Sequence, residues 1–331
     1  MQLDSVRELK ATLAWSVLEP MALSVVARRL VTVAAQPIES FPKLHRTMAL
    51  GISRSGDKEY RLAVRVQQRS LMKSREIDAI QEKARGEVDV RYVGRVIKRA
   101  VPWYQKRNRP LRIGGSIGHY KVTAGTLGCF VKRRADGAIL ILSNNHVLAD
   151  ENRSKVGDSI LQPGSHDGGS RPADVIGKLE DFVRLKAKGI NLVDCAVASV
   201  LEKVKYDATK LAGLGKLKGI SDADVDEGDR VAKVGRTTGV THGRVTAFEM
   251  DNMMIGYNYG EARFDSVIEI RGVGQKPFSD GGDSGSLIVD GQHRAVALLF
   301  SGTDPDTAGP DYTYANPIQS VLEKLKIDLL Y

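Results

Sequence analysis

Apolar residues near the start of the chain follow two different spacings. From Leu3 to Val17 they recur every three or four positions, which predicts a helix that Pro20 ends or kinks, with a second helix after it. Within residues 47–68, two apolar runs flank a turn that contains glycine. That pattern predicts a β-hairpin.

The pattern after the hairpin completes a small mixed domain. Ser74 suits the N-cap of a further helix, and residues 88–93 return to a strand pattern. Residues 1–100 are therefore expected to form an α+β domain. Residues 101–112 contain two prolines and are expected to form a linker.

The chain from Thr126 onward has an almost wholly β pattern. Short apolar runs separated by turn signals lie at 127–132, 138–142, 175–179, 193–200, 230–234, 243–248, 267–270, 286–289 and 294–300. This spacing, with glycine-rich turns, indicates a barrel or a sandwich pair. Only the last segment, 317–330, has the pattern of a helix.

Charge divides the chain in the same way. Residues 1–124 hold 24 Lys and Arg against 11 Asp and Glu, whereas residues 125–331 hold 25 against 29. The net charge of +9 is thus a basic N-terminal part joined to a slightly acidic remainder. We expect two domains, residues 1–108 and 109–331, and we expect any anionic partner to bind within residues 1–124.

Composition excludes several classes of protein. With 42% hydrophobic and 27% charged residues, the chain is neither disordered nor a coiled coil. Two cysteines in 331 residues favour a reducing compartment. The most apolar early stretch, 13–35, contains charges and Pro20, so no membrane span is expected, and a cytoplasmic location is the default. We expect no metal and no cofactor, because the sequence shows neither a ligand cluster nor a phosphate-binding loop.

Candidate chemistry begins with a serine between glycines. In Gly282-Asp283-Ser284-Gly285 the glycines permit the tight turn that exposes a nucleophilic hydroxyl and points backbone N–H groups at a developing oxyanion. An ordinary β-turn before a strand is the alternative interpretation.

A histidine and an aspartate extend this interpretation. His146 directly follows an apolar strand, and Asp194 precedes apolar residues that would bury it. Each alone is usually structural, but a buried carboxylate that orients an imidazole is what a serine nucleophile requires. The chain order His, Asp, Ser is that of the chymotrypsin arrangement.

Residues 125–331, about two-thirds of the chain, resemble trypsin-like serine peptidases of the chymotrypsin fold, closer to bacterial and intracellular forms than to digestive enzymes. The resemblance rests on Gly125-Thr-Leu-Gly-Cys-Phe-Val, Asn145-His-Val-Leu, Asp194-Cys-Ala-Val-Ala, Val234-Gly-Arg-Thr-Thr-Gly and Gly282-Asp-Ser-Gly-Ser. It implies two six-stranded antiparallel β-barrels and a C-terminal helix. The N-terminal domain resembles no family that we identify.

The resemblance also implies roles for individual residues. Ser284 would be the nucleophile, His146 the general base and then acid, and Asp194 its orienting partner. The backbone N–H groups of Gly282 and Ser284 would form the oxyanion hole.

The implied substrate pocket departs from that of trypsin. Phe278 stands at the pocket base, where a trypsin has aspartate, and the pocket wall would come from Phe300, Ser301 and Gly302. A deep Arg or Lys pocket is therefore not supported, although Asp280, Asp304 and Asp306 leave a basic P1 preference open. His242 could read an acidic P1 residue, but a turn residue is the more ordinary interpretation. The half-cystines that flank the histidine in digestive enzymes are absent, and Cys129 and Cys195 are expected to be buried.

One further motif resembles the activation site of trypsin zymogens. In Arg112-Ile113-Gly114-Gly115, cleavage after Arg112 would free an Ile113 amino group to pair with Asp283. The alternative is a glycine turn between linker and barrel.

The sequence thus favours a serine endopeptidase acting on protein or peptide substrates through an acyl-enzyme, with an N-terminal domain that recruits or regulates. The alternative is a non-catalytic protein on a peptidase scaffold that binds peptide or nucleic acid. For nucleic acid, the aromatic and basic residues of 101–109 would suit stacking and phosphate contact.

Overall fold

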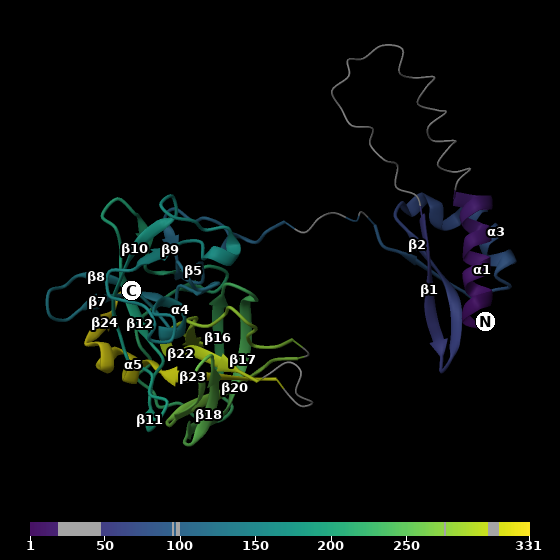
Figure 1. The fold of residues 1–331 in the computed structure, drawn as a ribbon. Coiled ribbons are helices and arrows are strands. Elements are labelled where there is room, and N and C mark those ends of the chain that lie inside the picture. The colour runs from purple at the N-terminus through teal and green to yellow at the C-terminus, as the bar shows by residue number, and fades with distance from the viewer. Residues whose placement is uncertain (19–47, 95, 97–99, 275, 304–310) are drawn as a thin grey trace, which may run out of the picture. The chain divides into compact units, whose positions relative to one another are not determined.

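A computed structural model of the chain describes residues 1–18, 48–94, 96, 100–274, 276–303 and 311–331 (Figure 1). The second helix expected after Pro20 lies outside these residues. The chain divides into two compact units, Met1–Ala100 and Val101–Tyr331. None of the helices in the described ranges is long and apolar enough to cross a membrane.

The first unit packs helices on one face of a three-stranded sheet. It contains α1 (Leu3–Leu13), a π-helical turn (Ala14–Leu18), β1 (Met48–Gly56), β2 (Glu59–Val66), a 3-10 turn (Arg69–Lys73), α3 (Arg75–Lys83) and β3 (Val88–Tyr92). The strand order is β1-β2-β3, with β2 antiparallel to β1 and parallel to β3. The helices, hairpin and strand predicted in this described part are confirmed.

The core of this unit explains why these elements form. Alternate residues of β2, Leu62 and Val64 among them, share one buried cluster with Val6 of α1 and Ile80 of α3. The Ser74 hydroxyl accepts a hydrogen bond from the Ile77 N–H at 3.4 Å and so caps α3 as expected.

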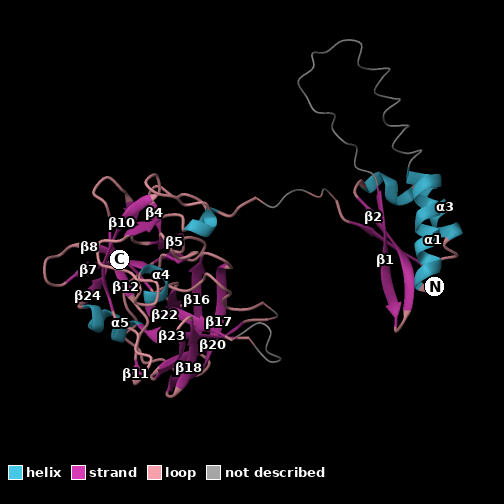
Figure 2. Cartoon of the chain, in the orientation of Figure 1, coloured by secondary structure: helices cyan, strands magenta, loops and turns pink. Residues whose placement is uncertain are grey.

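The second unit is built almost entirely of strands (Figure 2). Its closed six-stranded barrel has the order β16 (Arg230–Gly235), β17 (Gly239–Met250), β20 (Val267–Gly272), β23 (Tyr312–Pro317), β22 (Ala295–Gly302) and β21 (Leu287–Asp290). An eight-stranded sheet has the order β24 (Ile327–Leu329), β7 (Cys129–Arg133), β8 (Ile139–Ser143), β12 (Ala196–Ser199), β10 (Val175–Phe182), β9 (Ser159–Leu161), β5 (Ser116–His119) and β6 (Gly125–Thr126). A closed six-stranded barrel with a half-barrel confirms the predicted chymotrypsin-like fold class, but the second sheet has eight strands and is not the second six-stranded barrel that was predicted.

Smaller elements complete this unit. A three-stranded sheet joins β11 (Ile190–Asn191), β19 (Gly260–Phe264) and β18 (Met253–Tyr257), and two short pairs join β4 (Leu111–Arg112) to β13 (Tyr206–Asp207) and β14 (Lys210–Leu211) to β15 (Gly215–Lys216). The helices are α4 (Asn145–Leu148), α5 (Ile318–Leu325) and the 3-10 turns Trp103–Gln105 and Ser165–Asp167.

Burial on both faces explains why β22 is a continuous apolar run. Leu299 belongs to the interior cluster of the barrel, whereas Leu298 packs in the neighbouring cluster with Ile318 and Leu322 of α5. A strand covered on both sides has no position that favours a polar residue. All nine apolar runs predicted as strands contain or overlap one.

Two segments differ from the predictions. The C-terminal helix ends at Leu325, because Lys326 adopts a left-handed φ of 53° and the chain then pairs with β7 as β24. The linker expected over 101–112 instead packs within the second unit, where Leu111 is fully buried. Its apolar side chain stabilises that position through burial.

Candidate active site

His146 and Asp194 meet because two neighbouring strands place them at the same end of the sheet. Strand β8 pairs with β12 so that Ser143 lies opposite Ala196. His146 follows β8 in the short helix α4, and Asp194 lies two residues before β12. The His146 Nδ1 and the Asp194 Oδ2 are 2.6 Å apart, the length of a charge-assisted hydrogen bond.

Asp194 is fully buried, and protein groups satisfy its carboxylate. Its Oδ1 accepts the backbone N–H of Asn145 at 2.6 Å and that of His146 at 3.4 Å. The Tyr257 hydroxyl donates to Oδ2 at 2.9 Å. The backbone N–H of Asp194 donates to the Asn316 side chain at 2.9 Å. A buried charge is tolerated only with such a set of partners.

The His146 side chain is 22% exposed, so one edge of its ring reaches solvent. Burial lowers the pKa of this imidazole, but the charge and hydrogen bond of Asp194 and the charge of Glu151 outweigh it, and the pKa is raised overall. Because Asp194 holds Nδ1, Nε2 is the nitrogen left to exchange a proton. The pair can therefore act in general acid–base chemistry.

Ser284 lies on a tight turn that glycines make possible. Gly282 and Gly285 have φ angles of 94° and 90°, which side chains rarely adopt. The Asp283 N–H donates to Asp280 and the Gly285 N–H to Leu299, both at 2.9 Å. Among the described residues, the N–H groups of Gly282 and Ser284 donate to no acceptor, so neither is committed to a partner there.

Strand β6 connects this turn to the histidine. The Thr126 N–H donates to the Ser284 carbonyl at 2.8 Å, and the Ser143 hydroxyl donates to the Thr126 carbonyl at 2.7 Å. A Cβ placed at Gly125 would lie 2.4 Å from the Val147 side chain and 3.1 Å from the Ser284 carbonyl. The Ser284 turn and α4 therefore pack against the same glycine. Within the described residues no hydrogen bond joins the Ser284 hydroxyl to His146, and such bonds often tighten only when substrate is present.

Lys233, which no sequence motif indicated, stabilises the Ser284 turn through an ion pair with Asp283. Its Nζ lies 3.1 Å from the Asp283 Oδ2, and both side chains are fully buried. Burial lowers the pKa of Lys233, opposed by the charge and hydrogen bond of Asp283. The Asp283 Oδ1 also accepts the Thr237 N–H at 2.8 Å, and the Thr238 hydroxyl donates to its Oδ2 at 2.7 Å.

This pair contradicts the hypothesis of activation at Arg112. That hypothesis needs Asp283 to be available to a new Ile113 amino group, but Asp283 already has Lys233 as its cation. Ile113 itself is fully buried. The reason is local: a lysine on a barrel strand can reach the carboxylate that a freed N-terminus would otherwise meet.

Of the predicted pocket residues, two are buried in apolar clusters and two lie on the strand β22 with one edge unpaired in the described part of the chain. Phe278 and Phe300 are 1% and 3% exposed and pack in separate apolar clusters. Ser301 and Gly302 pair with β23, while the pairing of β22 with β21 ends at Leu298, so in the described part of the chain their other edge is unpaired. Asp280 is exposed.

Other candidate residues are placed as follows. Asp304 and Asp306 lie outside the described residues. His242 is exposed on strand β17, so its interpretation as a turn residue is wrong. The prediction that Cys129 and Cys195 are buried is confirmed, and burial raises the pKa of both thiols.

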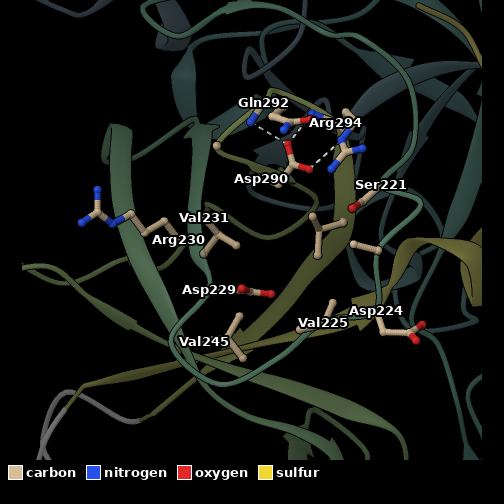
Figure 3. A pocket seen from close by; sticks show the side chains of 13 residues that line it. Ser221, Asp224, Val225, Asp229, Arg230, Val231, Val245, Asp290, Gln292 and Arg294 are labelled. Carbon is tan, nitrogen blue, oxygen red and sulfur yellow. Dashed lines mark hydrogen bonds and ion pairs between the residues drawn. The ribbon is translucent and has the colours of Figure 1, made fainter.

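A cavity of about 290 Å³ lies beside Asp290, the last residue of β21 (Figure 3). Val225, Val231 and Val245 line its wall, and Asp290 pairs with Arg294 at its rim. None of the predicted site residues lines it. In the described ranges, no cluster of His, Cys, Asp and Glu could hold a metal ion.

Comparison with known proteins gives relatives of low identity. No family model matches the chain. Protein NARROW LEAF 1 of Oryza sativa subsp. japonica is 27% identical over 247 residues, which are 63% of this chain and 40% of that protein. The chain thus spans about two fifths of the length of the curated relative it matches.

Three solved structures are similar to about two-thirds of the chain. Thermobifida fusca protease A is 15% identical with a TM-score of 0.46 and covers 66% of this chain and 98% of its own. Cellulomonas bogoriensis chymotrypsin is 17% identical with a TM-score of 0.44 over 66% and 98%. A glutamic acid specific serine protease is 21% identical with a TM-score of 0.47 over 66% and 100%. The chain is thus similar over about two-thirds of its length to bacterial serine proteases of the trypsin and chymotrypsin type.

Proposed function

We propose that the second unit is a serine endopeptidase that hydrolyses protein or peptide substrates. The observation that carries the proposal is the buried Asp194 that holds the His146 Nδ1 at 2.6 Å beside the Ser284 turn. An imidazole oriented in this way by a buried carboxylate is the general base that a serine nucleophile needs.

In the proposed reaction the Ser284 Oγ attacks the substrate carbonyl carbon while His146 Nε2 takes the hydroxyl proton. Asp194 stabilises the imidazolium that forms, and the open N–H groups of Gly282 and Ser284 bind the oxyanion. The imidazolium then donates its proton to the leaving amine, which leaves an acyl-enzyme. Water, deprotonated by His146, hydrolyses that ester and restores the Ser284 hydroxyl.

The unpaired edge of β22 supports a place for the substrate backbone. An extended peptide can add to Ser301 and Gly302 as a further strand, with hydrogen bonds between main chains. In this arrangement the scissile bond would lie against the Ser284 turn. Phe278 and Phe300 would shape the pocket from within the cores they occupy.

Replacement of Ser284 by Ala tests the proposal. We expect the variant to lose labelling by a fluorophosphonate probe and to lose peptide hydrolysis by a factor on the order of 10⁶. Ser221→Ala is the matched control, because Ser221 lines a cavity that none of the proposed active-site residues lines (Figure 3). A wild-type chain that neither reacts with the probe nor hydrolyses a peptide library would favour the non-catalytic binding alternative.

We propose further that the N-terminal unit regulates the site through the segment that follows it. The Gln105 side chain donates to the Arg236 carbonyl at 3.2 Å, and the Arg236 N–H donates to the Thr126 hydroxyl at 3.0 Å. That hydroxyl donates in turn to the Gly282 carbonyl at 3.0 Å. Gln105→Ala should slow probe labelling of Ser284, and Gln292→Ala, at an exposed position, should not. Equal labelling rates for the wild type and Gln105→Ala would contradict this route of regulation.

An anionic partner for residues 1–124 is the third part of the proposal. The face of the first sheet opposite its helices carries Arg61, Arg65 and Arg91, which supports such a partner, and Asp89 on the same face forms ion pairs with Arg65 and Arg91. A labelled single-stranded oligonucleotide should bind the full chain at low salt and dissociate as salt rises. Absence of binding at low salt would contradict a nucleic-acid partner. Two unpaired, buried cysteines support a reducing compartment such as the cytoplasm.

A further inference from the structure

The hairpin of β18 and β19 lies beside Asp194 although it follows that residue by some sixty positions. Strand β19 pairs parallel with β11, so that Asn191 lies opposite Phe264. The Asn191 side chain donates to the Arg263 carbonyl at 3.1 Å, and the Asp265 N–H donates to the Asn191 carbonyl at 3.0 Å. The hairpin is therefore fixed to the segment that carries Asp194.

This attachment brings the Tyr257 hydroxyl to the carboxylate. It donates at 2.9 Å to the Asp194 Oδ2, the same oxygen that faces His146 Nδ1 at 2.6 Å. Two backbone N–H groups hold the other oxygen, Oδ1. Tyr257 is thus the one side chain besides His146 that fixes Oδ2 among the described residues.

Packing holds the Tyr257 ring in this position. It stacks on Tyr259, with ring centres 5.4 Å apart and planes at 5°, and on Phe264 at 6.1 Å. It also contacts the His146 ring edge-on, with ring centres 6.3 Å apart. Burial, followed by the charge and hydrogen bond of Asp194, raises the pKa of the Tyr257 hydroxyl far above its ordinary value, so it stays a proton donor throughout the working range.

We propose that Tyr257 is a positioning residue that locks the Asp194 carboxylate in the orientation His146 requires. This inference rests on the proposed peptidase function. The hydroxyl acts on the reaction through Asp194. With its donor in place, Oδ2 cannot rotate away from Nδ1, and its negative charge is partly neutralised by the hydroxyl dipole.

Tyr257→Phe removes the hydroxyl and keeps the stacked ring. We expect kcat for peptide hydrolysis to fall about tenfold, the size of one hydrogen bond to a charged group, with KM unchanged because the hydroxyl faces Asp194. The His146 pKa should rise, because without the dipole more of the Asp194 charge acts on the imidazolium. The other ionisable groups around the pair, Glu151 and Tyr259, are unchanged in this variant.

Tyr259→Phe is the matched control, since Tyr259 belongs to the same stack and its hydroxyl makes no hydrogen bond in the described residues. It should leave both kcat and the His146 pKa as in wild type. The proposal is overturned if Tyr257→Phe keeps kcat within twofold, or if the two variants behave alike, which would mark a packing role only.

Titration of the His146 ring by NMR in a full-length Ser284→Ala background separates this inference from the proposed function. A rise in the His146 pKa on Tyr257→Phe in that background supports the positioning role even if the wild-type chain hydrolyses no peptide. An unchanged His146 pKa overturns the positioning role even if the wild-type chain is an active peptidase.

Discussion

The fully buried ion pair of Lys233 and Asp283 predicts how the Ser284 turn responds to a single lost charge. Lys233→Met keeps the approximate length of the side chain and its aliphatic stem. It removes the ammonium group that lies 3.1 Å from the Asp283 Oδ2. The carboxylate retains the Thr237 and Thr238 N–H groups at 2.8 and 3.2 Å and the Asp280 N–H at 3.1 Å. Its hydrogen bonds thus survive largely intact while its charge is left unpaired.

The expected cost follows from that unpaired charge. Breaking a buried pair by removal of one partner costs about 3–5 kcal/mol. For a unit of this size that corresponds to a fall in Tm of roughly 6–20 °C.

The two tryptophans allow the measurement, because Trp15 belongs to the first unit and Trp103 to the second. In a Trp15→Phe background, urea denaturation followed by Trp103 fluorescence reports the second unit alone. The rate of fluorophosphonate labelling in the same background reports the Ser284 turn, and it should fall together with stability.

The double variant Lys233→Met with Asp283→Asn is the control for charge. It has no buried charge left to compensate, so it should recover much of the lost stability. The reasoning is refuted if Lys233→Met alone lowers the free energy of unfolding by less than about 1 kcal/mol and is labelled at the wild-type rate.

Three further predictions concern the same site. The rate of hydrolysis should have a bell-shaped pH profile that is narrower than the ordinary pKa values of histidine, 6.5, and lysine, 10.5, would give. Activity should be lost as the pH falls through the raised pKa of His146 and again as the pH rises through the lowered pKa of Lys233. Activity that stays constant up to pH 10.5 would contradict this prediction. Gly285→Ala should lower the free energy of unfolding by about 3 kcal/mol or more in urea denaturation, since its φ is 90° and its Cβ would lie 2.1 Å from a buried serine hydroxyl, whereas Gly281→Ala, with open space around it, should be near neutral. Arg112→Gln, which blocks cleavage at that position, should keep the wild-type labelling rate; a chain that becomes reactive only after cleavage would restore the activation hypothesis.

Much of the fold could be predicted because burial of a strand is a local property of its sequence. The continuous run of β22 and the alternation in β2 are visible without knowledge of their partners. The end of the chain was harder, since residues 326–329 continue the apolar spacing of α5. Only the left-handed backbone of Lys326 and the pairing with β7, which lies almost two hundred residues earlier, turn it into a strand.

The residues of the candidate site also divide into those that a local sequence motif indicates and those that depend on a distant partner. His146, Asp194 and Ser284 could be selected because each stands in a short motif with chemistry of its own. Lys233 and Tyr257 could not, because each contacts a partner 50 or 63 residues away in sequence. A lysine within an apolar barrel strand was the available signal for Lys233: such a residue needs a buried counterion. Tyr257 carries no comparable signal, since tyrosine is common in strands.

The Lys233–Asp283 pair also limits where regulation can act. In a zymogen of the trypsin type, the aspartate before the nucleophilic serine has no cationic partner until cleavage frees a new N-terminal amino group. Here the cation is part of β16, so the turn is held while the chain is intact. The control by the N-terminal unit that we propose would therefore have to reach the Ser284 turn by another route. The hydrogen bonds from Gln105 through Arg236 and Thr126 end at the Gly282 carbonyl, so under the proposed function a displacement of the segment after the first unit would act on the proposed oxyanion hole.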